Sequence, residues 1–561
     1  MFGNMKYWLV TLFVLMSTML FTVSAQTSGG DGQQQPRKIE IKNSNTLEVN
    51  EILGPDVKIL RGDVQFYHDS STMYCDSAYY NTKENQFQAF GRVHIMRPSQ
   101  DGDTINLWGD SLHYNGANKY AKMRKNVKMT KDSMVMITEH IDYDMTKNVA
   151  NYFDGGTTFT GEDTLVSELG YFYPKTNDLV YNRDVVVHNP KYTMYSDTLT
   201  HNIKTKKSTF QGPTEIIGKD NYLYSESGWY NHNTDKAELT KNSYLVSKEH
   251  KLVGDTIYYD RNLKYGRGRS NVEIIDTAKS IQLTGNNVYY YEEPEHSLLS
   301  DSALMKYISK TDTLFLHADT IVSITDTIIE NQSDTTIFRI IKAFHHVKLF
   351  RHDIQSMCDS LVYNLYDSII TMYQTPVIWN DNNQLTAQTI KLYTIGNTVD
   401  MVEMLNSAFI ISEFDSLGHY NQIFGKNMVA YLDSNKITDI EVMSSANTIY
   451  YTDEDSIVTG MNQVSGENMH IIFNKKNKID KIWFYKNPKG TLHPLGAIRR
   501  SNRYLDGFVW YNKHRPIKME DIFYWETPTE TPLTAQRKQE MEDEDKEREE
   551  EARLNGEKIE N

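Results

Sequence analysis

The sequence predicts an all-β protein made of stacked strands, a β-jellyroll or solenoid with a repeat of about 29 residues. Three observations support this. A strand motif recurs at fixed spacing, helical periodicity is absent before the C-terminal tail, and tyrosine is abundant (37) while proline is scarce (13). Tyrosine packs well on pleated surfaces. A chain of 561 residues is too long for one compact core unless it is a repeat.

The N-terminus has the pattern of a secretory signal peptide. Lys6 precedes an apolar run from Trp8 to Phe21, and Val23-Ser24-Ala25 forms a small-residue cleavage site. The run is about 14 residues, short of the roughly 20 that a spanning helix needs. We expect residues 1–25 to be removed, with cleavage near Ala25. The alternative is an uncleaved anchor.

The repeat has a recognisable core, which is an apolar residue, a small residue, an acid, Ser or Thr, and then an apolar run. Met73–Tyr80 and Leu252–Tyr259 both follow this pattern. A regular series of acids is spaced by 29 residues, at Glu168, Asp197, Glu226 and Asp255. A second strand follows each core after a polar turn, as at Asn271–Ile274. Such a unit cannot bury an apolar face alone, so successive units must stack.

The segment Gly266–Arg269 can be interpreted as a basic loop for nucleic acid or as the turn between two strands of one repeat. The net charge of -15 argues against a polyanion as partner. We therefore expect a turn, and no nucleic-acid partner.

Breaks in the pattern suggest the domain organisation. The repeat is interrupted near residue 335, which predicts two homologous halves, 38–335 and 336–485. An aromatic cluster that includes Phe508 and Trp510 predicts a C-terminal cap over the last coil at 486–530, with a peptide-binding patch as the alternative. Residues 531–561 are strongly acidic and predict a solvated helix or a disordered tail, for which docking is the alternative role.

The face that lines the interior is not settled by alternation alone. Alternate residues of a strand point to opposite faces. By this count the recurrent acids lie on the same face as Ala78 and Leu112, whereas Met73 and Cys75 lie on the other face. A repeated acid is costly in an apolar interior, which favours the second set unless a bulge near the acid changes the register. The second strand of each repeat gives better candidates for an apolar groove, namely Val93, Ile95, Val127, Met129, Val187, Val272, Ile274 and Val377.

The motif Gly254–Asp260, followed by Asn271-Val272, resembles the OstA-like family. That family includes periplasmic lipopolysaccharide-transport proteins and the periplasmic domain of the outer-membrane lipopolysaccharide assembly protein. The similarity spans about 41–480, with Leu505–Trp510 similar to the C-terminal end of the long, two-copy form from Bacteroidetes-type bacteria. It implies a periplasmic β-jellyroll with a groove for the acyl chains of lipopolysaccharide. It also implies end-to-end strand addition to other β-jellyroll transport proteins and contact with the outer-membrane assembly protein. This chain is much longer than the single-jellyroll bridge protein.

No catalytic, metal or cofactor site is expected. Cys75 and Cys358 occupy equivalent repeat positions, which predicts small buried thiols many coils apart rather than a disulfide. His345 and His346 are adjacent on a strand, so they point to opposite faces and do not share a metal with His352-Asp353. No histidine recurs with the Asp-Ser/Thr pairs, as a nucleophile would require.

These observations predict a non-enzymatic, bridge-type lipopolysaccharide-transport protein that shields lipid A acyl chains on the way to the outer membrane. One alternative is a structural or adhesive β-solenoid without a ligand. A less favoured alternative is a β-helix polysaccharide lyase or hydrolase.

Overall fold

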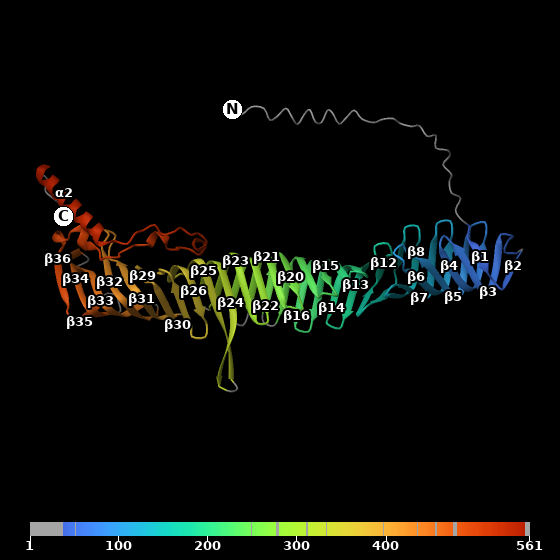
Figure 1. Cartoon of the computed structure of the whole chain (residues 1–561), viewed down its shortest axis with the longest axis horizontal. Helices are drawn as coiled ribbons and strands as arrows, with labels where there is room; N and C mark the ends of the chain where they lie inside the picture. Colours follow the sequence, from blue (N-terminus) through green and yellow to red (C-terminus); the bar gives the residue numbers. More distant parts are fainter. Residues whose placement is uncertain are drawn as a thin grey trace, which may run out of the picture.

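The computed structural model shows an elongated rod of stacked antiparallel strands (Figure 1), which confirms the all-β, stacked-strand prediction. It describes residues 38–555, apart from residues 51, 248–249, 277–279, 310–311, 332–333, 397, 435, 455–456 and 475–478. The predicted signal peptide lies outside the described residues. Within them, no helix is long and apolar enough to span a bilayer.

Thirty-six strands form one hydrogen-bonded sheet. The first group is β1 (Glu40–Asn43), β2 (Thr46–Val49), β3 (Val57–His68), β4 (Ser71–Asn81), β5 (Gln86–Pro98), β6 (Thr104–Asn115), β7 (Tyr120–Lys131), β8 (Met134–Asp144), β9 (Val149–Tyr152), β10 (Gly156–Thr160), β11 (Asp163–Ser167) and β12 (Leu169–Tyr173). The middle group is β13 (Asp178–Asn189), β14 (Tyr192–Asn202), β15 (Lys207–Gly218), β16 (Asn221–Asn231), β17 (Lys236–Lys241), β18 (Ser243–Ser247), β19 (His250–Gly254), β20 (Thr256–Asp260), β21 (Tyr265–Asp276), β22 (Ile281–Glu292), β23 (Glu295–Ile308) and β24 (Thr313–Asn331). The last group is β25 (Asp334–Arg351), β26 (Ile354–Asn364), β27 (Ile369–Tyr373), β28 (Val377–Asn380), β29 (Asn383–Thr386), β30 (Thr389–Ile395), β31 (Thr398–Glu413), β32 (Tyr420–Asp433), β33 (Lys436–Glu454), β34 (Ile457–Phe473), β35 (Ile479–Tyr485) and β36 (Lys489–Pro494).

Most strands bend sharply at their midpoint. In β21 the bend is at Ser270 and Asn271, whose φ angles of 59° and 52° lie in the left-handed region. The pairing of β21 with β22 shifts register between Arg269 and Val272. Such a bulge turns the chain and shifts the alternation of the paired strand by one residue. In β22, odd-numbered positions face inward on one side of the bend, and even-numbered positions face inward on the other. Each bent strand therefore contributes one half to layer A, as residues 71–75 do, and the other half to layer B, as residues 77–81 do.

The bend resolves which residues face inward. In β4 the buried positions are Met73 and Cys75 before the bend and Ala78 and Tyr80 after it. Leu112 is likewise buried. The residues of both parities therefore face the interior, Met73 and Cys75 before the bend and Ala78 and Leu112 after it. The register shift near the acid makes this possible, as the sequence required.

The recurrent acid of each repeat holds the bend of the next strand. Asp255 Oδ2 accepts a hydrogen bond from Asn271 Nδ2 at 2.8 Å. Equivalent contacts join Asp76 to Arg92, Asp110 to Asn126, Glu168 to Arg183 and Glu226 to Asn242. Asn is also among the residues best tolerated in left-handed conformation. The acids lie on the outer side of the bend and have a structural role.

The 29-residue repeat corresponds to two bent strands. The starts of β11, β14, β16 and β19, at residues 163, 192, 221 and 250, follow the predicted spacing. Eight pairs of short strands are the two halves of one bent strand, so the described chain contains 28 bent strands. At ~4.8 Å per strand the rod is roughly 130 Å long.

Gly266–Arg269 does not form the predicted turn. These residues are the first half of β21 and pair with β20. Gly266 and Gly268 face the crowded interior, where a Cβ on Gly268 would lie 2.5 Å from Val272. Arg267 faces outward and stacks on Tyr289 at 4.9 Å. Glycine is required here because a larger side chain would not fit. The sequence alone does not show whether a glycine is needed for packing or for a turn.

β24 and β25 form a long hairpin that projects from the rod (Figure 1). The boundary predicted near residue 335 falls at the tip of this hairpin. One hydrophobic core extends from Ile39 to Ile471 without separating at that point. The predicted segments 38–335 and 336–485 therefore share a continuous interior. Cys75 and Cys358 are buried, free thiols.

Residues 495–533, which we name the C-terminal strap, run back along the outer surface of layer A (Figure 1). The strap begins against Met461 of β34 and Tyr451 of β33, and continues past these late strands to Gln355 of β26. The strap contains four 3-10 helices, η1 (Leu495–Ala497), η2 (Arg500–Arg503), η3 (Asn512–His514) and η4 (Met519–Phe523). It is followed by the acidic helix α2 (Ala535–Asn555), the helical form of the predicted tail.

Buried glutamines fasten the strap to layer A. Gln422 donates to Arg503 O at 2.7 Å and accepts from Leu505 N at 2.8 Å. Gln384 makes the same pair of bonds with Val509 O and Tyr511 N, both at 2.7 Å. A third glutamine, Gln355, accepts from Arg515 Nε at 2.7 Å. The strap itself forms no strand. The glutamine side chains therefore supply hydrogen bonds that a neighbouring strand would otherwise make.

The bend acids are expected to contribute to stability. Replacing Asp110, Glu226 and Asp255 together with Ala removes three side-chain contacts that lie far apart. We expect the free energy of unfolding to fall by about 3 kcal/mol, roughly 1 kcal/mol for each site. The midpoint of urea denaturation measures this change.

The control is a triple Ala variant of acids outside the recurrent series, at Glu162, Asp220 and Glu273. Its midpoint should match that of the parent protein. Equal midpoints for both triple variants would show that the recurrent acid does not stabilise the bend.

The strap should be released when its glutamine contacts are lost. Gln384→Leu leaves Val509 O and Tyr511 N without partners, so cleavage of the strap in limited proteolysis should be about ten-fold faster. Gln388→Leu, at an exposed position of the same loop region, should leave the rate unchanged.

Candidate functional site

The predicted groove residues are all buried, and most of them lie together in the interior. Val93, Ile95, Val127, Met129, Val187, Val272 and Ile274 belong to the continuous core and are at most 2% exposed. They come from the layer A halves of bent strands, where Val127 and Val272 directly follow the bend residues at 125–126 and 270–271. These seven residues line one wall of the interior.

Val377 is the exception. It packs with Met357 and Trp379 on the outer surface of layer A, beneath Tyr511 and Trp525 of the strap. The neighbouring residue Ile378 occupies the interior position instead. Residues 377–380 are buried on both faces because the strap covers this strand. The unbroken apolar run Val-Ile-Trp is the sequence signal of a strand covered on both sides.

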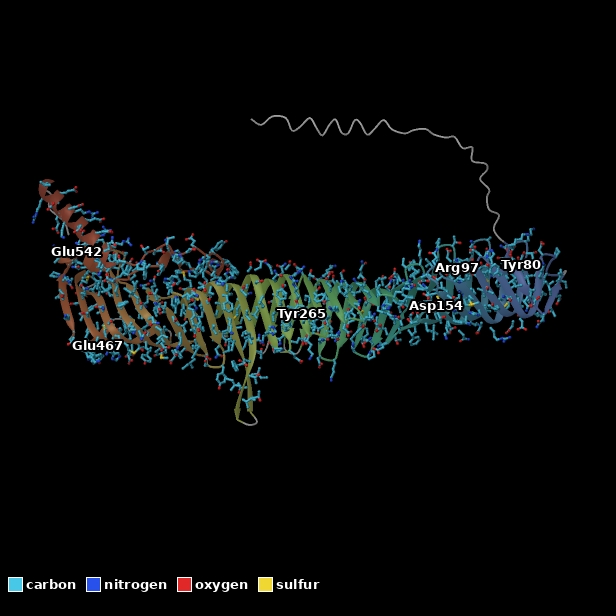
Figure 2. All side chains as sticks on the ribbon, in the orientation of Figure 1. Tyr80, Arg97, Asp154, Tyr265, Glu467 and Glu542 are labelled. Carbon is cyan, nitrogen blue, oxygen red and sulfur yellow. The ribbon has the colours of Figure 1, made fainter. Side chains whose placement is uncertain are left out.

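The two layers meet along a line opposite the bends, which we name the seam, and charged residues close it in the first part of the rod. Lys119 of layer B bonds Asp69 of layer A at 2.7 Å. Lys131, which is fully buried, bonds Asp101 at 2.7 Å and Pro174 O at 3.0 Å. The exposed pairs contribute little, whereas breaking a buried one costs about 3–5 kcal/mol. Figure 2 shows the labelled Arg97 in this region, where it donates to Met145 O at 3.4 Å.

Tyrosine hydroxyls add a second set of contacts at the seam. Tyr114 bonds His68 at 2.7 Å across the two layers. Tyr230 donates to Asp235 at 3.0 Å, and Tyr259 donates to Glu292 at 3.0 Å. Burial raises the pKa of each of these tyrosines well above its usual value. They therefore remain neutral donors, with an apolar ring in the core and a polar tip at the seam.

Arg339 marks the end of the closed part. It is 3% exposed and contacts Asp276 at 3.1 Å, Glu295, and His250 Nε2 at 3.1 Å. One guanidinium thus joins β25 to residues on β19, β21 and β23. A buried cation with two carboxylates is stable only when all partners remain in place.

Beyond Arg339 the described residues line three cavities that are partly open to solvent. Cavity 1, of about 150 Å³, has an apolar wall that includes Leu349, Met372 and Leu392. Cavity 2, of about 20 Å³, shares Ile354 and Val399 with cavity 1. Cavity 3, of about 1210 Å³, shares Ile437 with cavity 2. Shared lining residues make these cavities one interrupted path along the interior. We treat this path as the candidate functional site.

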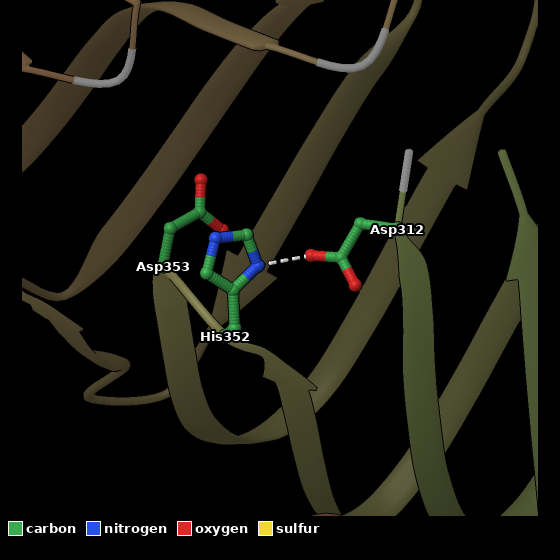
Figure 3. A group of neighbouring side chains, drawn as sticks. All are labelled: Asp312, His352 and Asp353. Carbon is green, nitrogen blue, oxygen red and sulfur yellow. Dashed lines mark hydrogen bonds and ion pairs between the residues drawn. The ribbon is translucent and has the colours of Figure 1, made fainter. Parts of the chain in front are cut away.

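Polar residues at the mouth of cavity 1 include the group Asp312, His352 and Asp353 (Figure 3). Their ligand atoms lie within 4.8 Å of one another, a spacing that a metal ion could use. However, Arg351 already bonds both carboxylate oxygens of Asp353, at 2.5 and 3.1 Å. His352 is exposed and bonds Asp312. Ion pairs account for this group, so it gives no support to a metal site.

His345 and His346 lie at a bend and contact different acids. His345 bonds Asp359 at 3.2 Å, and His346 bonds Asp319 at 2.9 Å. The two imidazoles therefore belong to separate ion pairs.

These features define a class of protein, a long β-jellyroll with two antiparallel layers and an apolar interior that is closed over one part and hollow over another. Residues 36–197 match the family model described as OstA-like protein. This part of the chain is OstA-like, which confirms the family assignment over that range. A search of curated proteins gives no match.

Among solved structures, the chain is similar to LptH from Pseudomonas aeruginosa, described as the LptA-homologous periplasmic component of the conserved lipopolysaccharide transport device. The similarity covers 21% of this chain and 82% of that chain, with 17% identity and a TM-score of 0.19.

The seam should weaken in acid. Burial, followed by the neighbouring charge of His232, lowers the pKa of His201 to about 3. Its unfolded form takes up a proton below about pH 6.5, so stability is lost as pH falls from there toward 3. The hydrogen bond from Lys119 lowers the pKa of Asp69, whose contribution is present above its unfolded pKa and lost below about pH 4.

We therefore expect the melting temperature to fall as pH decreases below about 6.5, with a further fall below about 4. His201→Gln should flatten the first phase and leave the second. A melting temperature that stays constant from pH 7 to 4.5 in the parent protein would contradict this assignment.

Proposed function

We propose that the protein is a periplasmic, bridge-type component of lipopolysaccharide transport that shields lipid A acyl chains in its interior. The observation that carries this proposal is the path of cavities 1–3, whose apolar walls include residues of both β-layers and which Arg515 of the strap borders at cavity 3. The OstA-like match at residues 36–197 supports the same class of function. The proposed role is binding and transfer, without catalysis.

The energetics suit such a role. Each methylene group removed from water is worth about 0.8 kcal/mol, so ten of them are worth roughly 8 kcal/mol. Ile354, Val399 and Ile437 each line two of the cavities, and their apolar contacts with a hydrocarbon chain have no preferred direction. An interior of this kind retains a hydrocarbon chain yet offers no single deep site at which it would be trapped.

The closed part must separate along the seam before its core residues can contact lipid. Val93, Val187 and Val272 are fully packed, and the contacts of Lys131 and Arg339 hold the layers together. We propose that lipid occupies the hollow part directly and enters the closed part when the seam opens. The packed first part is also the observation that favours the rival function, a structural β-solenoid without ligand.

The ends of the rod suit strand addition. At one end β1 and β2 pair with β3, and at the other β35 and β36 pair with β34. Terminal strands of this kind offer backbone groups to another sheet. We propose that other β-jellyroll transport proteins and the outer-membrane assembly protein bind there. Export through a signal peptide at residues 1–25 belongs to the same proposal.

Photo-crosslinking in cells tests lipid binding. A photoreactive residue at Val402, which lines cavity 2, should crosslink to lipopolysaccharide. The same residue at Val187 should crosslink once the seam opens in transport. Ile217, a large apolar residue that faces outward, is the control and should give no lipopolysaccharide adduct.

Crosslinks from Val402 and Val187 only to protein neighbours would exclude lipid transport and favour the structural rival. Depletion of the protein provides a second measurement. It should leave newly made lipopolysaccharide at the inner membrane.

A further inference from the structure

Cavity 3 differs from the other two in chemistry. Its deep wall is apolar and includes Ile437, Ile440 and Phe473. Its other wall follows the edge of layer A and carries carboxylates, amides, hydroxyls and the ring of Tyr450. A volume of about 1210 Å³ exceeds the roughly 300–1,000 Å³ of ordinary ligand sites. The cavity has room for a polar group and for part of a hydrocarbon chain.

The polar wall is rich in hydrogen-bond acceptors. Glu413 lies beside Asn382, because Glu413 N donates to Asn382 O at 3.1 Å, and Asn383 pairs with the neighbouring Ser412. Ionised carboxylates accept hydrogen bonds and cannot donate them. A ligand that satisfies this wall must therefore bring donors, as a group with many hydroxyls does.

The charge of the wall acts against a phosphate. Four carboxylates line the cavity, those of Asp381, Glu413, Asp415 and Asp453. Among the described residues that line it, the one cation is Arg515, which already donates to Gln355 Oε1 and Asp381 O, each at 2.7 Å. A phosphate brings negative charge and only acceptors, so the described carboxylates would repel it and could not bond to it.

We infer that cavity 3 binds the saccharide part of an amphiphile whose hydrocarbon part extends into cavities 1 and 2. This inference rests on the proposed function and specifies where the headgroup lies and which of its chemical groups is held. Sugar hydroxyls donate to the carboxylates and amides, and the face of the sugar ring lies against Tyr450. The shared residue Ile437 places the start of the chain beside the entrance to cavity 2.

Two probes with the same chain and different headgroups test the inference. The full chain is titrated with n-octyl β-D-glucoside and with n-octyl phosphate, both below their critical micelle concentrations, by isothermal titration calorimetry. We expect tighter binding of the glucoside. Glu413→Leu should weaken glucoside binding about ten-fold, because one charge-assisted hydrogen bond is lost, and should leave phosphate binding equal or stronger.

Glu441→Leu is the matched control, since Glu441 is exposed and lies outside the cavity. It should change neither affinity. Thermal melting of both variants shows whether the fold is intact.

The possible outcomes distinguish failure of the saccharide inference from failure of the proposed lipid-binding function. Equal affinities for both probes, or an equal effect of Glu413→Leu on both, would overturn the saccharide inference and leave chain binding intact. Tighter binding of the phosphate would overturn it in the same way. Binding of neither probe would overturn the proposed function as well.

Discussion

The bend at the middle of each strand, which is left-handed in alternate strands, is the constraint on which the rest of the structure depends. Because two consecutive residues such as Ser270 and Asn271 take positive φ angles, one strand supplies both layers and the alternation of its partner shifts by one residue at the bend. The carboxylate of the preceding strand holds this geometry from outside. Without the bend the apolar residues of each strand would be divided between two faces, and no interior would form.

Closure of the interior is a separate problem from its formation. Stacking joins each strand to its neighbours but does not join the two layers along the seam. In the first part that task falls to side chains such as Lys119, Lys131 and Tyr114, which contact partners 43–50 residues away. After Arg339 the corresponding edges line cavities. One fold therefore provides a packed rod and a hollow one within the same continuous core.

The sequence was sufficient to predict the fold class and the spacing of the repeat, because a motif such as Leu252–Tyr259 recurs in many units. Seven of the eight groove candidates lie in the interior for the same reason. The strand at Gly266–Arg269 was mistaken for a turn because glycine signals both a turn and crowding. Val377 lies on the outer surface because residues 495–533 cover its strand, and this contact depends on tertiary structure.

The location of the cavities could not be predicted. They arise where the edges of the two layers no longer contact each other, and that depends on the stagger between layers. The contact of Lys119 with Asp69 spans 50 residues and crosses units of the repeat. No periodicity of 29 residues reveals such a pair. The acids of cavity 3 likewise lie in turns and at strand ends, where the sequence alone predicts exposure to solvent.

The strap has a consequence for the order in which the protein is completed. Its glutamine partners Gln355, Gln384 and Gln422 all lie in the hollow part, where the layers lack the closure described for the first part. External bracing thus reinforces the wall that is least supported from within. Because the strap is also the last described segment before α2, it is synthesised after every strand that it crosses. The packed portion can mature early, whereas the hollow portion reaches its final rigidity only when the whole chain is available.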